Sequence, residues 1–189
     1  MKISPALKAT LVVAAMAGVL FLSWSKYREF LSRGREAPAS AVQLNNLVRD
    51  GFPKISLSEL DGRDVRLENY LGKVVILNFW ASWCDPCVAE FPSLVKLIDR
   101  FKGEVHLIAV SADYERKDIE SFLKMFKANL PAIHVVWDRD LKLANQLGTN
   151  KLPESYIIGK DGHLVRKVAG VDDWSNASAI EFFESLVKK

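Results

Sequence analysis

The only two cysteines of this 189-residue chain, Cys84 and Cys87, are two residues apart and follow an apolar run at residues 74–77. The β-branched run predicts a buried strand that ends near Ser82. Beyond it, apolar residues recur at helical spacing, namely Val88, Phe91, Leu94, Val95, Ile98 and Phe101. A strand therefore ends just before the cysteines and a helix begins at them. Two thiols in this position indicate a redox site.

The helix start suggests different roles for the two thiols. Cys84 is expected where unpaired backbone N–H groups and the positive end of the helix dipole stabilise a thiolate, so we predict that it is the nucleophile. Cys87 follows one turn later on the same helix face, and we assign it the resolving role. Pro86 suits the first helical turn, where its missing N–H costs no hydrogen bond. Asp85 adds a negative charge that opposes thiolate formation.

Zinc is the other chemistry that a Cys-x-x-Cys pair can serve. A structural zinc site needs four ligands, and the sequence has no second cysteine pair. Its three histidines, His106, His134 and His163, are isolated in segments that are typical of strands and turns. We therefore predict no metal site.

The motif W-C-x-x-C-x-x-E-x-P at residues 83–92 resembles the thioredoxin superfamily, and within it the membrane-anchored TlpA/ResA/CcmG-like branch. The resemblance extends from about Phe52 to the C-terminus, because that branch has equivalents of Asp61-Gly62, Gly72-Lys73 and residues 152–155. It implies thiol–disulfide exchange without a metal or organic cofactor. The redox group would be a disulfide between the two cysteines.

The segments after residue 73 alternate between strand-like and helical patterns and end in an amphipathic helix. This pattern predicts an α/β fold with a central mixed β-sheet and helices on both faces. The apolar runs on either side of Asp61-Gly62 predict an N-terminal hairpin extension. The resemblance implies a thioredoxin-like fold and identifies one helix–strand unit as an insertion.

The resemblance also assigns supporting roles around the cysteines. Leu152-Pro153 lies where the family carries a cis-proline, and the backbone of Leu152 would pair with an extended client. Trp83 would cover the edge of the site. Glu90 is either a solvated acidic residue in the first turns of a helix or, as in the family, a carboxyl group near the active-site cleft. We predict the second.

Two further polar residues lie close to the predicted site. Asn78 stands where ordinary thioredoxin carries a buried aspartate that accepts the proton of the resolving thiol. An amide cannot take up that proton, so Glu90 becomes the candidate relay. Glu154, beside the presumed substrate groove, could recognise a client or merely face solvent.

About 17 uncharged residues between Lys8 and Lys26 predict a membrane-spanning helix. We divide the chain into an anchor with its flanks (1–33), a linker of small residues (34–46) and a thioredoxin-like domain (47–189). A signal peptide cleaved near residues 15–17 is the competing interpretation, although that site would cut through the apolar run. Basic residues on both sides leave the orientation undecided. The resemblance implies a cytoplasmic-membrane anchor with the domain on the periplasmic side.

The net charge of +3 comes from the basic N-terminal segment, and the remainder is nearly balanced. No stripe of Lys and Arg with interleaved aromatic residues is present there, which argues against a nucleic-acid partner.

These features predict a membrane-tethered protein disulfide reductase. The resemblance names apocytochrome c or copper-assembly proteins as clients, and a transmembrane thiol reductase as electron donor. A disulfide-donating oxidase has the same motif. An AhpC-like peroxidase usually carries Pro-x-x-x-Thr/Ser-x-x-Cys, and residues 76–84 lack that proline. A non-catalytic scaffold with this fold is the remaining alternative.

Overall fold

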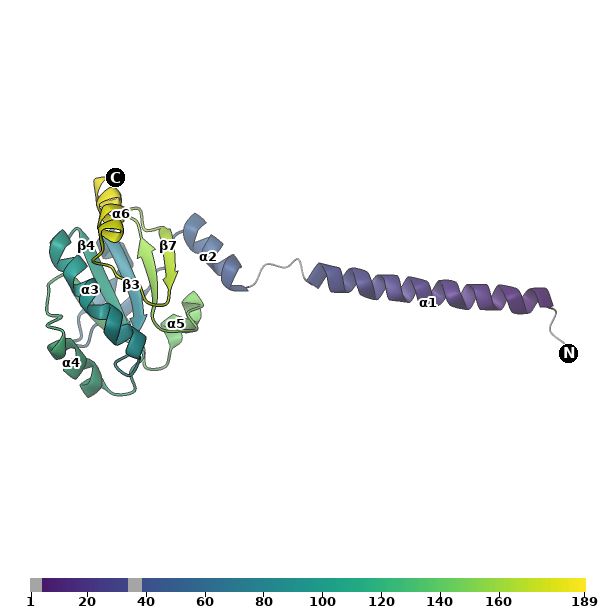
Figure 1. Ribbon diagram of the computed structural model, residues 1–189, viewed down its shortest axis with the longest axis horizontal. Coiled ribbons are helices and arrows are strands. Elements are labelled where there is room, and N and C mark those ends of the chain that lie inside the picture. Colours follow the sequence, from purple (N-terminus) through teal and green to yellow (C-terminus); the bar gives the residue numbers. More distant parts are fainter. Residues whose placement is uncertain (1–4, 34–38) are drawn as a thin grey trace. The chain divides into compact units, whose positions relative to one another are not determined.

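The computed structural model of the protein describes residues 5–33 and 39–189 (Figure 1). The chain divides into two units, residues 1–42 and residues 43–189. The helices are α1 (Pro5–Arg33), α2 (Ala39–Arg49), η1 (Leu67–Tyr70), α3 (Asp85–Phe101), α4 (Arg116–Met125), α5 (Lys142–Leu147) and α6 (Ala177–Lys188). The strands are β1 (Ser56–Ser58), β2 (Asp64–Arg66), β3 (Val74–Trp80), β4 (Val105–Ser111), β5 (Ile133–Trp137), β6 (Glu154–Ile158) and β7 (Leu164–Ala169).

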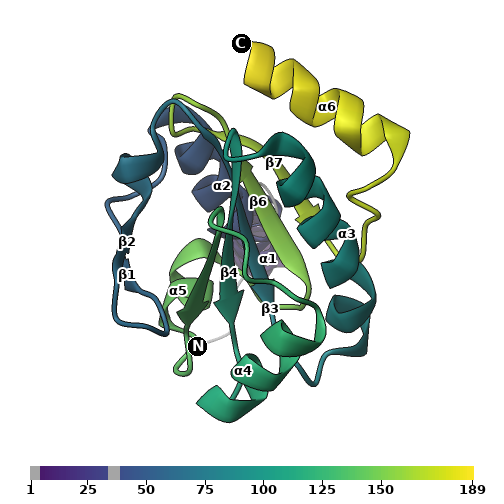
Figure 2. The ribbon, with the colours of Figure 1, turned by 90° about the vertical axis from the view of Figure 1, so that its left-hand side faces the viewer.

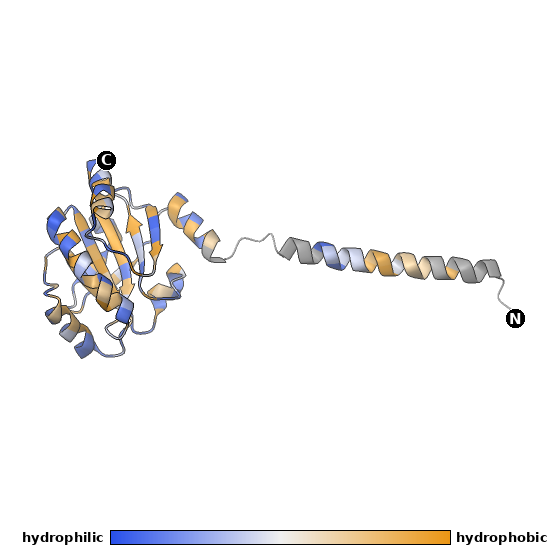
Figure 3. Ribbon diagram, in the orientation of Figure 1, coloured by the Kyte–Doolittle hydropathy of each residue, from blue (hydrophilic) through white to orange (hydrophobic). Residues whose placement is uncertain are grey.

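The second unit contains a five-stranded mixed sheet in the order β5-β4-β3-β6-β7. Strands β3, β4 and β5 are parallel and are joined through α3 and α4, whereas β6 and β7 run antiparallel to their neighbours. Parallel neighbours need crossover helices, which explains the alternation of strands and helices in the sequence. All residues of β3 are buried, and this central strand is apolar along most of its length in Figure 3. The predicted α/β fold with a central mixed sheet is confirmed.

Two apolar cores lie on opposite faces of the sheet. One core is formed with α3, α4 and α6, whose buried members include Phe91, Phe122 and Phe183. The other is formed with α2, β2 and α5, and includes Leu47, Val65 and Leu147. Figure 2 shows α3 and α6 on one side of the sheet and the β1–β2 hairpin and α5 on the other. Because both faces are covered, the central strands carry nearly continuous apolar runs.

The N-terminal hairpin predicted around Asp61-Gly62 is present as strands β1 and β2, which form a small sheet of their own. Part of the predicted linker is helical instead. Residues 34–38 lie outside the described residues, but residues 39–49 form α2, with Leu47 only 4% exposed. The small residues of this stretch obscured the spacing of Leu44 and Leu47, which both contribute to the second core.

The predicted membrane anchor requires a correction. In the part of the chain that the structure describes, no helix combines the length and the apolar character needed to cross a bilayer. The uncharged run that suggested a span has about 17 residues, which is the lower end of the range of about 17–25 that a bilayer core requires. The predicted anchor, and the membrane location that depended on it, are therefore wrong.

Two histidines that are far apart in the sequence meet on β4 and β5. Nδ1 of His106 lies 3.2 Å from Nε2 of His134, and Nδ1 of His134 lies 2.9 Å from a carboxylate oxygen of Glu59. The ring of Tyr70 contacts both imidazoles edge-on. Since Glu59 follows β1, these contacts attach the hairpin to the main sheet.

The contribution of His106 to stability should fall as the pH drops from 7 toward 5. Burial, reinforced by His134, lowers the pKa of His106. The unfolded chain then binds a proton below about pH 6.5 that the folded state takes up only at lower pH, so protonation favours unfolding. In urea unfolding, the stability of a His106→Gln variant relative to the wild type should rise as the pH drops from 7 to 5. Equal slopes in both proteins would contradict this explanation.

Candidate active site

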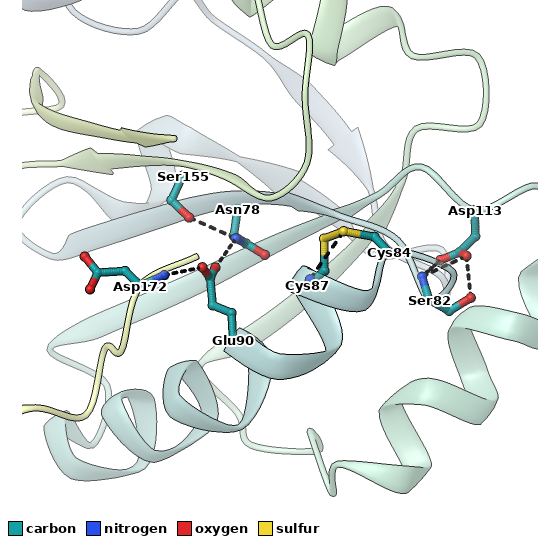
Figure 4. Close-up of a disulfide and its surroundings, with 8 residues drawn as sticks. All are labelled: Asn78, Ser82, Cys84, Cys87, Glu90, Asp113, Ser155 and Asp172. Carbon is teal, nitrogen blue, oxygen red and sulfur yellow. Dashed lines mark hydrogen bonds between the residues drawn. A yellow bond between two sulfur atoms is a disulfide. The ribbon is translucent and has the colours of Figure 1, made fainter. Parts of the chain in front are cut away.

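Cys84 and Cys87 lie where β3 gives way to α3. Cys84 is the N-cap residue of α3, with extended backbone, and its sulfur accepts a hydrogen bond from the N–H of Cys87 at 3.3 Å. A disulfide joins the two residues, whose Cα atoms are 5.2 Å apart (Figure 4). The buried strand and the helix axis thus fix the sulfur of Cys84 at the end of α3 where backbone N–H groups are unpaired.

A groove of about 720 Å³ opens beside Cys84. Its walls include the loop before α3, the residues after β4, helix α5 and the loop before β6, which contributes Leu152. Cys84 is 7% exposed and lines this groove, whereas Cys87 is 2% exposed and is not among the lining residues. A disulfide entering the groove therefore meets Cys84 first.

Two exposed aromatic side chains border the groove next to Cys84. Trp83 and Tyr114 are 56% and 70% exposed, and their rings are nearly parallel with centroids 6.3 Å apart. Trp83 thus lies at the edge of the site. Tyr114, which lies shortly after β4, was not among the predicted site residues.

The remaining groove residues from the prediction also lie around the disulfide. Asp85 and Pro86 are exposed in the first turn of α3 and line the groove. The peptide bond between Leu152 and Pro153 is cis. Pro153 is buried, and its carbonyl oxygen accepts a hydrogen bond from the N–H of Gly170 at 2.9 Å. This contact ties the loop before β6 to the end of β7.

Glu90 lies one turn beyond Cys87 on α3 and is only 2% exposed. One carboxylate oxygen accepts from the side-chain amide of Asn78 at 3.2 Å, and the other accepts from the backbone N–H of Asp172 at 2.9 Å. Burial raises the pKa of Glu90 to about 7, and the Asp172 charge adds to the shift although the hydrogen bonds oppose it. Glu90 is therefore a buried carboxyl group that can change protonation near neutral pH.

Asn78 connects this carboxyl group to the neighbouring strand. Its amide nitrogen also donates to the hydroxyl of Ser155 at 2.8 Å, across the β3–β6 pair. Its carbonyl oxygen is buried and has no hydrogen-bond partner among the residues that the structure describes. Asn78 thus orients Glu90, as Figure 4 shows, but its amide takes up no proton.

Asp113 was not among the site residues predicted from the sequence. It is fully buried and accepts hydrogen bonds from the backbone N–H and the hydroxyl of Ser82, at 3.0 and 2.6 Å. The signal was present, because Ser82 and Asp113 each follow a predicted buried strand. The carboxyl ends of adjacent parallel strands meet at one edge of a sheet, where ligand sites gather.

Glu154 neither faces solvent nor lines the groove. It is 3% exposed, and its carboxylate lies 3.0 Å from the ammonium group of Lys167 and 3.4 Å from the hydroxyl of Tyr156. The hydroxyl of Tyr156 also donates to the carbonyl of Leu147 at 2.8 Å and lies 3.0 Å from that of Thr149. Glu154 therefore belongs to a buried network beneath the loop that precedes Leu152.

Residues 48–167 match the AhpC/TSA family. The chain belongs to this family. A thiol-disulfide oxidoreductase ResA of Bacillus cereus is 34% identical to it over 119 residues, covering 62% of this chain and 67% of the relative. ResA of Bacillus subtilis (strain 168) is 31% identical over 137 residues, covering 72% and 73%.

Solved structures agree with this membership. A putative thiol:disulfide interchange protein DsbE from Chlorobium tepidum has a TM-score of 0.58 and 28% identity, covering 73% of this chain and 93% of its own. A putative thioredoxin from Neisseria meningitidis has a TM-score of 0.63 and 27% identity, covering 72% and 89%. The fold is thioredoxin-like, and the chain is a thiol–disulfide oxidoreductase of the ResA/DsbE type.

Replacing Glu90 by Gln should stabilise the protein increasingly as the pH rises from 5 to 8. The folded pKa of about 7 exceeds the usual 4.5, so the wild-type folded state holds a proton that the unfolded chain releases. The Glu90 contribution to wild-type stability therefore falls through this range, and the variant lacks that loss. After allowance for solvent screening, the difference between the two proteins should grow by about 1–2 kcal/mol in urea unfolding.

The exposed residue Glu181 on α6 offers a matched control. Glu181→Gln should follow the wild-type pH dependence. A Glu90→Gln difference that stays constant from pH 5 to 8 would show that Glu90 does not titrate in the buried site.

Proposed function

We propose that this oxidoreductase reduces disulfides of particular protein clients, with Cys84 attacking and Cys87 resolving. The position of Cys84, at the N-cap of α3 and in the groove wall, carries this proposal. The helix terminus favours its thiolate, which is the reactive form. Because Cys87 is buried, a client disulfide does not react with it directly, and its thiol remains available to attack the mixed disulfide at Cys84.

The proposed cycle is a two-step exchange. The Cys84 thiolate attacks one client sulfur, the client S–S bond breaks, and the second client sulfur leaves as a thiolate. Cys87 then loses its proton and attacks the Cys84 sulfur. The client departs as a dithiol, and the disulfide between Cys84 and Cys87 forms. Two electrons pass to the client, and the cycle needs no metal or organic cofactor.

Glu90 is the proposed acceptor for the Cys87 proton. It lies one turn along the same helix, and its pKa of about 7 lets it take up and release a proton near neutral pH. Asn78 and the N–H of Asp172 hold both carboxylate oxygens in place. Glu90 would thus accept the proton that the amide of Asn78 cannot take up.

The proposed clients are apocytochrome c, whose haem-attachment motif is Cys-x-x-Cys-His, or copper-site assembly proteins. The family resemblance at residues 83–92 and the groove of about 720 Å³ beside Cys84 support this choice. A reductant must itself be re-reduced, and a transmembrane thiol reductase is the proposed electron donor.

A Cys87→Ala variant should trap the mixed disulfide. When the reduced variant is mixed with an oxidised Cys-x-x-Cys-His peptide, the client should stay bound to Cys84, because the resolving thiol is missing. Intact-mass spectrometry after acid quenching should show the added peptide mass. The adduct should disappear on treatment with dithiothreitol.

Cys84→Ala is the matched control and should give little adduct, because Cys87 is buried and does not line the groove. A peptide with the same disulfide but without the histidine tests client choice. Equal trapping of both peptides would refute the haem-motif preference and leave the exchange chemistry intact. Adduct on Cys84→Ala alone would reverse the two cysteine roles.

A further inference from the structure

The ends of β3 and β4 are joined by a carboxylate that the exchange reaction does not itself use. Trp80 and Ser111 are paired in the parallel register, so Ser82 and Asp113 each lie two residues beyond that pair. The Asp113 carboxylate accepts from the Ser82 N–H and hydroxyl at 3.0 and 2.6 Å, and from the Ser111 hydroxyl at 2.7 Å. Figure 4 shows the Ser82 contacts directly beside Cys84.

All polar groups of Asp113 are engaged. Its backbone N–H donates to the Ser111 hydroxyl at 3.0 Å, and its carbonyl accepts from the indole N–H of Trp137 at 2.6 Å. Among the described residues, no Lys or Arg forms an ion pair with this fully buried side chain. A buried carboxylate is tolerated only when hydrogen bonds replace its lost hydration. Breaking the hydrogen bonds from Ser82 would leave this buried carboxylate poorly solvated, so these bonds hold the Ser82 loop firmly.

The residues that follow each end of this contact form the groove wall. Trp83 and Cys84 follow Ser82, and Tyr114 follows Asp113. The Trp83 and Tyr114 rings stack at the mouth of the groove, and Cys84 lies in its wall. The hydrogen bonds between Ser82 and Asp113 thus set the spacing between the aromatic pair and the attacking sulfur.

We propose that Asp113 is a positioning residue for thiol–disulfide exchange: its carboxylate holds the Ser82 loop so that peptide clients bound against Trp83 and Tyr114 present their disulfide to Cys84. The inference rests on exchange at Cys84 and does not depend on which protein is the client. Asp113 acts through the loop and touches no reacting atom.

Substitution of Asp113 by asparagine or by alanine distinguishes a role in holding the loop from a role that depends on the negative charge. The side-chain oxygen of Asn can still accept from Ser82, and its amide can donate to the Ser111 hydroxyl oxygen, which has two lone pairs. Asp113→Asn therefore keeps the loop in place without the charge. Asp113→Ala removes both side-chain acceptors and leaves the two Ser82 donors and the Ser111 hydroxyl without their partner.

The test compares exchange rates of the reduced full-length variants with two oxidants. One is a disulfide-bonded Cys-x-x-Cys peptide with flanking residues, and the other is bis(2-hydroxyethyl) disulfide, which is too small to engage the aromatic pair. Stopped-flow tryptophan fluorescence follows oxidation at a temperature well below the unfolding midpoint of each variant. Asp99→Asn, an exposed substitution on α3, is the control and should match the wild type.

Asp113→Ala should slow the peptide reaction by about tenfold or more and the small-disulfide reaction much less, since a small misplacement of groups costs rate only where binding geometry matters. Asp113→Asn should recover the peptide rate to within about threefold of the wild type. Wild-type rates in folded Asp113→Ala would overturn the proposal. Equal slowing of both oxidants would also overturn it, because the substitution would then act on Cys84 itself and not on the presentation of a peptide.

If Asp113→Ala does not fold, the Ser82→Ala, Ser111→Ala double variant replaces it. This variant leaves only the Ser82 N–H on the carboxylate and should slow the peptide reaction selectively by several-fold. An unchanged ratio of peptide to small-disulfide rates in the folded double variant would refute the proposal. Loss of all exchange in the wild type would instead refute the function itself.

Discussion

The active site depends on the junction between the fully buried strand β3 and helix α3, which begins directly after Cys84. All residues of β3 are buried between two apolar cores, so the end of this strand is fixed in the sheet. Helix α3 starts directly after Cys84, which places the sulfur at unpaired backbone N–H groups. The groove, the cis bond at Leu152–Pro153 and the aromatic pair are all arranged around that fixed sulfur.

Three buried carboxylates surround this junction, and each is satisfied in a different way. Glu90 has few donors and a raised pKa, so it is suited to proton exchange. Asp113 is held by neutral hydrogen-bond donors and joins two strand ends. Glu154 is paired with Lys167 beneath the loop that precedes Leu152. The three carboxylates therefore differ in their partners, which are an amide and a backbone N–H for Glu90, hydroxyls and a backbone N–H for Asp113, and an ammonium group for Glu154.

Local patterns predicted the elements that carry the chemistry. The β-branched run before Cys84 and the helical spacing after it located the junction, and Asp61-Gly62 located the hairpin. The partners of Asp113 and Glu154 were not predictable in this way. Ser82 approaches Asp113, and Lys167 approaches Glu154, only because of the way the strands pair. Local sequence patterns do not reveal that strand register. Two predictions failed where composition was given more weight than spacing or length. The small residues of α2 suggested a linker although Leu44 and Leu47 have helical spacing, and the uncharged run in α1 suggested a membrane span although it is short.

The central claim is that this protein donates electrons to client disulfides, and the equilibrium reduction potential of the Cys84–Cys87 pair tests it most directly. The full-length protein would be equilibrated in defined thiol–disulfide buffers, quenched by alkylation and quantified by mass. A potential near that of thioredoxin, about −270 mV, or lower is the result expected of a reductant. A potential near about −120 mV, as in DsbA, would make the protein a disulfide donor and contradict the proposed direction of electron flow.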